Sequence, residues 1–134
     1  MNVQTFAAVG SIAAVTVAVV TGLLVAGSPA EQRLLRLDDR RVSDLRQLSS
    51  AAQFQWEQNQ TLPASPAALV DGRYLSRLPV DPAGQSYEYR ATGPRAFEVC
   101  VVFDRPSRPE LVGDFWFHEA GRKCFPFDVT ESRR

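Results

Sequence analysis

The chain has 134 residues, with 15 basic and 15 acidic side chains, so its formal net charge at pH 7 is zero. Acids and bases are interspersed, and such a pattern produces no broad positive field that would attract nucleic acid. We therefore expect no nucleic-acid partner. After the apolar N-terminal stretch about a hundred residues remain, enough for one small domain.

The first predicted element is a transmembrane helix over residues 6–27, preceded by a short segment of residues 1–5. Residues 6–26 carry no charged side chain. About 20 apolar residues, at about 1.5 Å rise each, span the ~30 Å hydrocarbon core of a lipid bilayer. The run is longer than the apolar region of a signal peptide, which predicts an uncleaved membrane anchor.

Small side chains recur at every fourth position of this span, at Gly10, Ala14, Ala18, Gly22 and Ala26. This spacing lets the backbone of another helix approach closely within a membrane. We predict that these residues pack against another membrane protein subunit. The alternative is that an Ala-, Gly- and Val-rich span produces the spacing by chance.

Two arguments disagree about the side of the membrane on which residues 28–134 lie. Basic residues follow the span and none precedes it, namely Arg33, Arg36, Arg40, Arg41 and Arg46. The positive-inside rule would therefore leave the domain in the cytoplasm. A cysteine pair in a small domain is more typical of an oxidising compartment. We favour the second argument and predict a periplasmic domain anchored in the cytoplasmic (inner) membrane.

Residues 31–59 are predicted to form a long amphipathic helix. One helical face carries Leu35, Val42, Leu45, Ala52 and Trp56, with Leu48 beside it. We expect Leu45 and Trp56 to be buried under a sheet, and the polar face to be solvated surface. Pro29 either begins this helix or kinks a continuous one.

Thr61-Leu62-Pro63 ends the long helix, and Ser65 before Pro66 predicts the N-cap of a short helix over residues 65–70. The apolar period then changes from 3.6 to 2, which predicts three or four antiparallel strands within residues 86–129. The alternating residues are Tyr87 and Tyr89, then Phe97, Val99, Val101 and Phe103, then Phe115 and Phe117, and then Phe125, Phe127 and Val129. The predicted fold is α+β, with the long helix packed on a small three- to four-stranded antiparallel sheet.

The two cysteines, Cys100 and Cys124, point away from the aromatic face of the predicted sheet by strand parity. They can bond only if their strands are neighbours, because a disulfide needs Cα atoms within about 7 Å. We predict this disulfide, the alternative being two unpaired cysteines packed as small apolar side chains. Two cysteines and a lone His118 do not suffice for a metal site.

Two stretches resemble a known protein family. FQWEQNQTLPASPAAL (54–69) and LPVDPAGQSYEY (78–89) are similar to the helix end and the Leu-Pro-x-Asp-Pro-x-Gly-x-x-Tyr-x-Tyr link of type IV pilins, and most closely of the major pseudopilins of type II secretion. The resemblance covers about residues 35–90 and implies a pseudopilin-like, exported domain. The family's basic leader and the glutamate of its apolar helix are missing here. What the resemblance implies is a fold rather than an activity.

The sequence shows no arrangement of residues for nucleophilic catalysis and no phosphate-binding loop, and His118 is expected to be structural. We therefore predict no enzyme activity and no cofactor. The favoured hypothesis is a single-pass structural or assembly subunit of a larger respiratory, photosynthetic or transport complex. The alternative is a divergent pseudopilin of a type II secretion or type IV pilus apparatus. A third hypothesis, a binding module, depends on exposure of Trp116 and Phe127.

Overall fold

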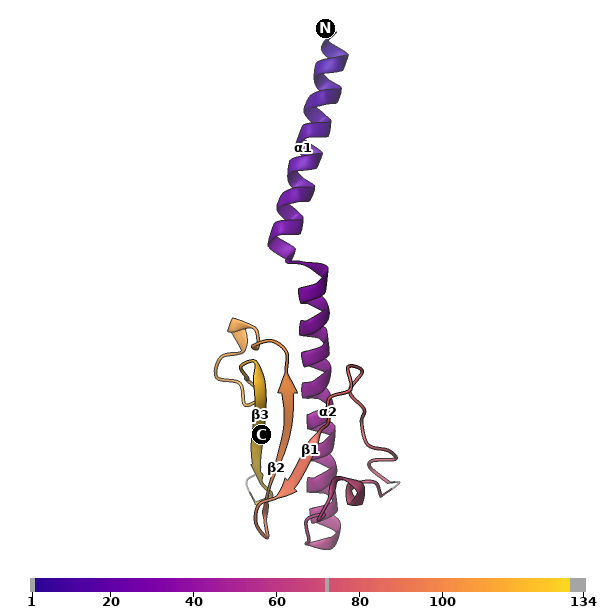
Figure 1. The fold of residues 1–134 in the computed structure, drawn as a ribbon, viewed down its shortest axis with the longest axis vertical. Helices are drawn as coiled ribbons and strands as arrows, with labels where there is room; N and C mark the ends of the chain where they lie inside the picture. Colours follow the sequence, from indigo (N-terminus) through magenta and orange to yellow (C-terminus); the bar gives the residue numbers. More distant parts are fainter. Residues whose placement is uncertain (1, 72, 131–134) are drawn as a thin grey trace. The chain divides into compact units, whose positions relative to one another are not determined.

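The computed structural model describes residues 2–71 and 73–130, which divide into two compact units at Arg33 and Leu34. The predicted α+β class is confirmed. The helices are α1 (Val3–Ala26) and α2 (Pro29–Asn59), with short 3₁₀ helices η1 (Pro66–Leu69) and η2 (Pro109–Leu111). The strands are β1 (Glu88–Ala91), β2 (Ala96–Phe103) and β3 (Gly121–Asp128) (Figure 1).

The helix α1 is long and apolar enough to cross a membrane. Among the described residues, no helical stretch apart from the one that contains α1 has the length and hydropathy of a membrane span. The side chains of residues 2–25 are all exposed. Three of its hydroxyl groups are satisfied internally, since Ser11, Thr16 and Thr21 each donate to the carbonyl four residues earlier. This is the arrangement that a lipid environment requires of polar side chains.

A short break separates α1 from α2. Gly27 ends α1 with a positive φ of 75°, a conformation that glycine adopts without strain. The Ser28 hydroxyl then accepts a hydrogen bond from the Glu31 N–H at 3.2 Å, as an N-cap does. Pro29 therefore begins the second helix rather than kinking a continuous one.

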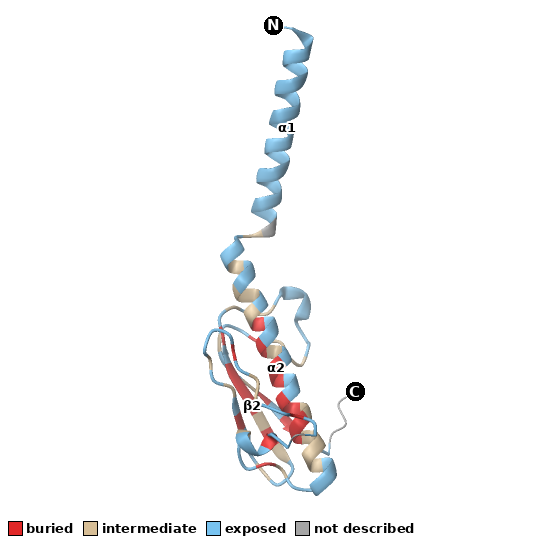
Figure 2. Ribbon diagram, turned by 90° about the vertical axis from the view of Figure 1, so that its right-hand side faces the viewer, coloured by how far each residue is buried: buried red, intermediate tan, exposed pale blue. Residues whose placement is uncertain are grey.

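In the second unit, one face of α2 packs on the sheet and forms the hydrophobic core. The helix contributes Leu45, Leu48, Ala51 and Ala52, and the strands contribute Tyr89, Phe97, Val99, Val101, Phe103, Phe125 and Phe127. Figure 2 shows the buried residues on the facing parts of α2 and β2. The prediction for Leu45 is confirmed, whereas Trp56 is only partly buried.

The described residues contain three strands in the order β1-β2-β3, with both pairs antiparallel. The fourth strand predicted at Phe115 and Phe117 is wrong. Asp114 folds this segment into a turn, because its carboxylate accepts the Trp116 N–H at 2.7 Å and its carbonyl accepts the Phe117 N–H at 3.1 Å. The Phe115 ring instead packs against the rings of Phe125 and Phe127.

The predicted short helix is present as η1. Ser65 holds the N-cap position and Pro66 the first turn, as predicted, although the Ser65 side chain makes no capping hydrogen bond. After η1, one carboxylate oxygen of Asp71 accepts the N–H groups of Arg73 and Tyr74, each at 2.9 Å. This turn directs the chain into the extended link that leads to β1.

Candidate functional site

A buried arginine is the centre of the most connected polar cluster in the domain. Arg41 lies on α2 with a fully buried side chain. It precedes Leu45 by four residues and Leu48 by seven, so it continues the core-facing stripe of the helix. The prediction that the polar face of this helix is solvated is therefore wrong at Asp38, Arg41 and Asp44, all of which are buried.

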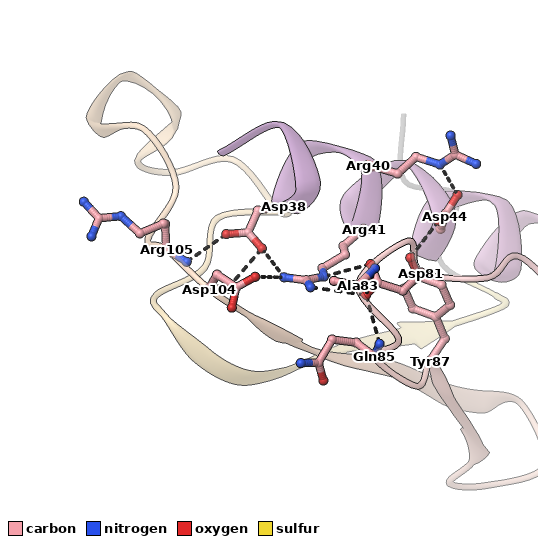
Figure 3. A network of polar contacts seen from close by, with 10 residues as sticks. All are labelled: Asp38, Arg40, Arg41, Asp44, Asp81, Ala83, Gln85, Tyr87, Asp104 and Arg105. Atoms are coloured by element: carbon pink, nitrogen blue, oxygen red, sulfur yellow. Dashed lines mark hydrogen bonds and ion pairs between the residues drawn. The ribbon is translucent and has the colours of Figure 1, made fainter. Parts of the chain in front are cut away.

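Three carboxylates surround the Arg41 guanidinium (Figure 3). The Asp81 carboxylate accepts two parallel hydrogen bonds from Arg41: Oδ1 accepts from Nε at 3.1 Å and Oδ2 from Nη2 at 3.2 Å. The third nitrogen, Nη1, donates to Asp38 Oδ1 at 2.7 Å and to Asp104 Oδ2 at 2.6 Å. Bidentate charge-assisted pairs of this kind are the geometrically most specific hydrogen bonds in proteins.

The carboxylates also hold backbone groups, so the cluster joins three distant segments. Asp81 Oδ2 accepts the N–H of Gln85 at 2.9 Å and that of Ala83 at 3.2 Å, which fixes the Asp-Pro turn of the link. The oxygens of Asp38 accept the N–H groups of Asp104 and Arg105 just after β2. One guanidinium therefore fastens α2 to the link and to the end of β2.

The pKa shifts agree with a tightly bonded ion cluster. Burial by itself would lower the pKa of Arg41, but the hydrogen bonds to Asp81, Asp104 and Asp38 outweigh it and raise that pKa above its ordinary value. Burial likewise acts to raise the pKa of Asp81, yet the bonds from Arg41 and from the Gln85 N–H hold it below the usual range. Both groups are therefore charged at neutral pH.

A second contact joins the link to the helix next to this cluster. The Tyr87 hydroxyl donates to Asp44 Oδ2 at 2.6 Å, and Arg40 Nε donates to Asp44 Oδ1 at 3.1 Å. Burial, followed by the bond to Asp44, raises the pKa of Tyr87 above its ordinary value. Two residues of the Asp-Pro-x-Gly-x-x-Tyr-x-Tyr stretch, Asp81 and Tyr87, are thus bonded to α2.

A groove of about 270 Å³ lies on the other side of Asp38, between α2 and the loop after β2. Trp116, half-buried, forms part of its wall, and the Arg46 guanidinium stands 5.4 Å from the centre of the Trp116 ring. Phe127 does not reach this groove, because it is buried in the core. The binding-module hypothesis therefore loses Phe127, whose place on the apolar face of the sheet is confirmed.

His118 also lines this groove while remaining almost completely buried. Its ring stacks on Phe103 with centroids 3.5 Å apart, and Nδ1 lies 3.3 Å from the Glu119 carbonyl oxygen. Burial lowers the pKa of His118, against the opposing hydrogen bond to Glu119, which favours the neutral ring at pH 7.

The two cysteines lie directly opposite each other on β2 and β3. Their Cα atoms are 4.1 Å apart and their Sγ atoms are at disulfide distance, 2.13 Å, as predicted from strand parity. The Glu98 carboxylate lies within 4.8 Å of both sulfur atoms. Cysteines joined in a disulfide are not thiolate ligands, so this group of residues does not form a metal site in its oxidised state.

The small residues of α1 remain a prediction as a packing surface. Gly10, Ala14, Ala18 and Gly22 are all exposed along the helix. A Cβ atom added at Gly10 or Gly22 would meet no other atom within 4 Å. The side chain of Ala26, the fifth member of the predicted stripe, lies outside the described residues. The four described positions are open to a neighbouring helix.

Comparisons of the chain with protein-family models, with curated proteins and with solved structures found no match. The pseudopilin resemblance therefore depends on the residues of this chain alone.

Proposed function

We propose that this chain is a single-pass structural or assembly subunit, whose exported pseudopilin-like domain packs on a larger membrane complex of the respiratory, photosynthetic or transport type. The observation that carries the proposal is α1, whose apolar side chains are exposed along its length. An apolar surface of this extent is stable only in lipid or against other apolar helices.

The pseudopilin-like character of the domain is supported by the roles of the residues that carry the resemblance. Asp81 accepts the bidentate bond from Arg41, Tyr87 bonds to Asp44, and Tyr89 is part of the core. The link motif thus holds the sheet to the long helix, which is a physical reason for the sequence pattern. A role in the fold rather than in chemistry agrees with an assembly subunit.

Export is supported by the cysteine pair. A disulfide that closes a loop of 24 residues stabilises a small domain by about 3 kcal/mol in the chain-entropy model. Such bonds persist in oxidising compartments and are rare in the cytosol. The disulfide therefore favours the periplasmic side, whereas the arginine-rich start of α2 favours the cytoplasm.

A divergent pseudopilin of a type II secretion or type IV pilus apparatus is the second candidate function. The link residues Asp81 and Tyr87 favour it, because both belong to the stretch that resembles the family and both are hydrogen-bonded to α2. The apolar span counts against it, because residues 6–26 contain no acidic side chain. The resemblance implies that subunit assembly uses a glutamate near the start of this helix.

The test is purification of the full chain from its native membranes in a mild detergent, followed by the intact mass of the purified chain. An assembly subunit should retain other membrane subunits in a fixed ratio and keep its N-terminal residues. A chain cut within residues 6–26, or N-methylated there, would favour the pseudopilin. A chain that purifies alone would contradict both functions.

A further inference from the structure

The groove between α2 and the loop after β2 has two different walls. The helix contributes residues three or four positions apart, including Leu35, Asp39, Val42 and Arg46. From Leu35 to Arg46 this wall is about 16 Å long, at about 1.5 Å per residue. The loop contributes the opposite wall, which includes Leu111, Trp116 and His118.

The apolar part of the groove continues onto an exposed rim. Leu111 is 42 % exposed and its neighbour Val112 is 70 % exposed. The charged residues lie at the edge, where Arg108 and Asp39 form an ion pair at 3.2 Å with both side chains largely exposed. A half-buried tryptophan with apolar neighbours inside a charged rim is the anatomy of a protein-binding hot spot.

Two polar groups of the groove have no partner among the described residues. The indole Nε1–H of Trp116 donates to no acceptor there, although the backbone N–H of the same residue is bonded to Asp114. The imidazole of His118 uses only Nδ1, toward the Glu119 carbonyl. In this tautomer Nδ1 carries the proton and Nε2 is a hydrogen-bond acceptor. The groove thus offers one donor and one acceptor beside apolar side chains.

We propose that this groove binds an extended peptide segment of a partner subunit, which places a bulky apolar side chain against Trp116 and its backbone amide between Trp116 and His118. A peptide unit supplies a carbonyl for the indole N–H and an N–H for Nε2, whereas the backbone groups within a helix are already bonded to one another. The proposal rests on the proposed function and names the surface through which the exported domain joins its complex.

The length of the helical wall fits an extended segment. A segment of about five extended residues, at about 3.3 Å each, matches the 16 Å wall. Alternate side chains of such a segment point to the same side, so one enters the groove while its neighbours meet the charged rim.

The experiment places a photoreactive benzoylphenylalanine at Leu111, on the groove rim, in the full chain expressed in its native host. A matched probe at Val102, on the outer face of the sheet, is the control. Ser43→Leu fills the groove from the exposed side of α2 without touching the core. Gln47→Leu, one turn farther along α2 and outside the groove, is its control. Urea unfolding of each variant, followed by tryptophan fluorescence, confirms that its domain is folded.

The proposal expects one cross-linked product from the Leu111 probe, mapping to an extended segment of another subunit, and none to that segment from the Val102 probe. Ser43→Leu should reduce its yield at least about twentyfold, the loss of one hot-spot contact, and Gln47→Leu should not. A product that maps to a helix or to a second copy of this chain would overturn the proposal. Loss of the product with Gln47→Leu, or its persistence with Ser43→Leu, would do the same.

The proposed function and the groove fail in different ways. If partners co-purify in a fixed ratio but the Leu111 probe gives no product, the assembly role stands and the groove is not its interface. If no partner co-purifies, the assembly role is refuted and this inference with it.

Discussion

The Arg41 cluster makes the sharpest stability prediction. Arg41→Leu removes the guanidinium and leaves the carboxylates of Asp38, Asp81 and Asp104 facing one another without a counter-charge. The Arg41 and Asp81 side chains are fully buried, and only Asp104 is partly exposed, at 36 %. Removing one member of a buried ion pair costs about 3–5 kcal/mol, because the remaining charge is left unpaired away from water.

Arg40→Leu is the matched control. It is the adjacent arginine on the same helix and also pairs with an aspartate, but its side chain is 60 % exposed. Asp44 is buried, but it keeps the hydrogen bond from Tyr87 when Arg40 is removed. Because the Arg40 charge is exposed to water, we expect its loss to cost about 0.2–1 kcal/mol, as in an exposed pair. Native domains are stable by about 5–15 kcal/mol, so the Arg41 change should remove a large share of that free energy and the Arg40 change a small one.

The assay is urea unfolding of the full chain in detergent, followed by tryptophan fluorescence with the disulfide kept oxidised. We expect Arg41→Leu to lower the free energy of unfolding by at least about 3 kcal/mol, and the melting temperature by more than about 10 °C. Equal losses for the two variants, or a loss below about 1 kcal/mol for Arg41→Leu, would refute the claim that this cluster holds the helix to the link and the sheet.

Four further predictions concern the same domain and its anchor. The pKa of Asp81 is lowered from its ordinary value of 3.8, so the stability that its charged form contributes is complete above that pH and is lost as the pH falls toward the lower folded-state pKa. Asp81→Asn should therefore lower the free energy of unfolding in urea by less below pH 3.8 than above it. A loss of free energy that does not change with pH would contradict this. Replacing both Cys100 and Cys124 by alanine should cost about 3 kcal/mol, and thiol reagents should leave both cysteines of the unreduced, denatured wild type unmodified; modification of both would remove the main support for export. Leu45→Ala should cost about 2–5 kcal/mol in the same unfolding assay, and Trp56→Ala less because that side chain is only partly buried, so a larger loss for Trp56 would contradict the packing. Leucine at Ala18 and Gly22 should release the partner subunits while the span still inserts, and an unchanged ratio of co-purified partners would make the small-residue stripe an accident of composition.

The regular parts of the fold follow from local patterns in the sequence. The 3.6-residue period of residues 31–59 predicts α2 to within two residues of its observed start at Pro29. The alternation around Phe97 and Phe125 predicts two of the strands, and parity alone predicts that Cys100 and Cys124 share a face. These features depend on neighbours in the chain, which is why they can be read from it.

The Phe115 to Phe117 segment shows where alternation is not sufficient. Two aromatic residues one position apart satisfy the strand pattern, but Asp114 accepts nearby N–H groups and stabilises a turn instead. The buried ion cluster could not be predicted either, since Arg41 meets Asp81 and Asp104 from 40 and 63 residues away. One indication was available: Arg41 lies on the helical stripe of Leu45 and Leu48, where an unpaired charge would be costly.

The mass of the particle that contains this chain tests the central claim most directly. The full chain, at its natural expression level, would be extracted from native membranes in a mild detergent and weighed as an intact particle by native mass spectrometry. We expect a particle much heavier than the 14.8 kDa chain, with other membrane subunits in an integer ratio to it. A particle that contains only the 14.8 kDa chain and detergent would contradict the claim that this protein is an assembly subunit.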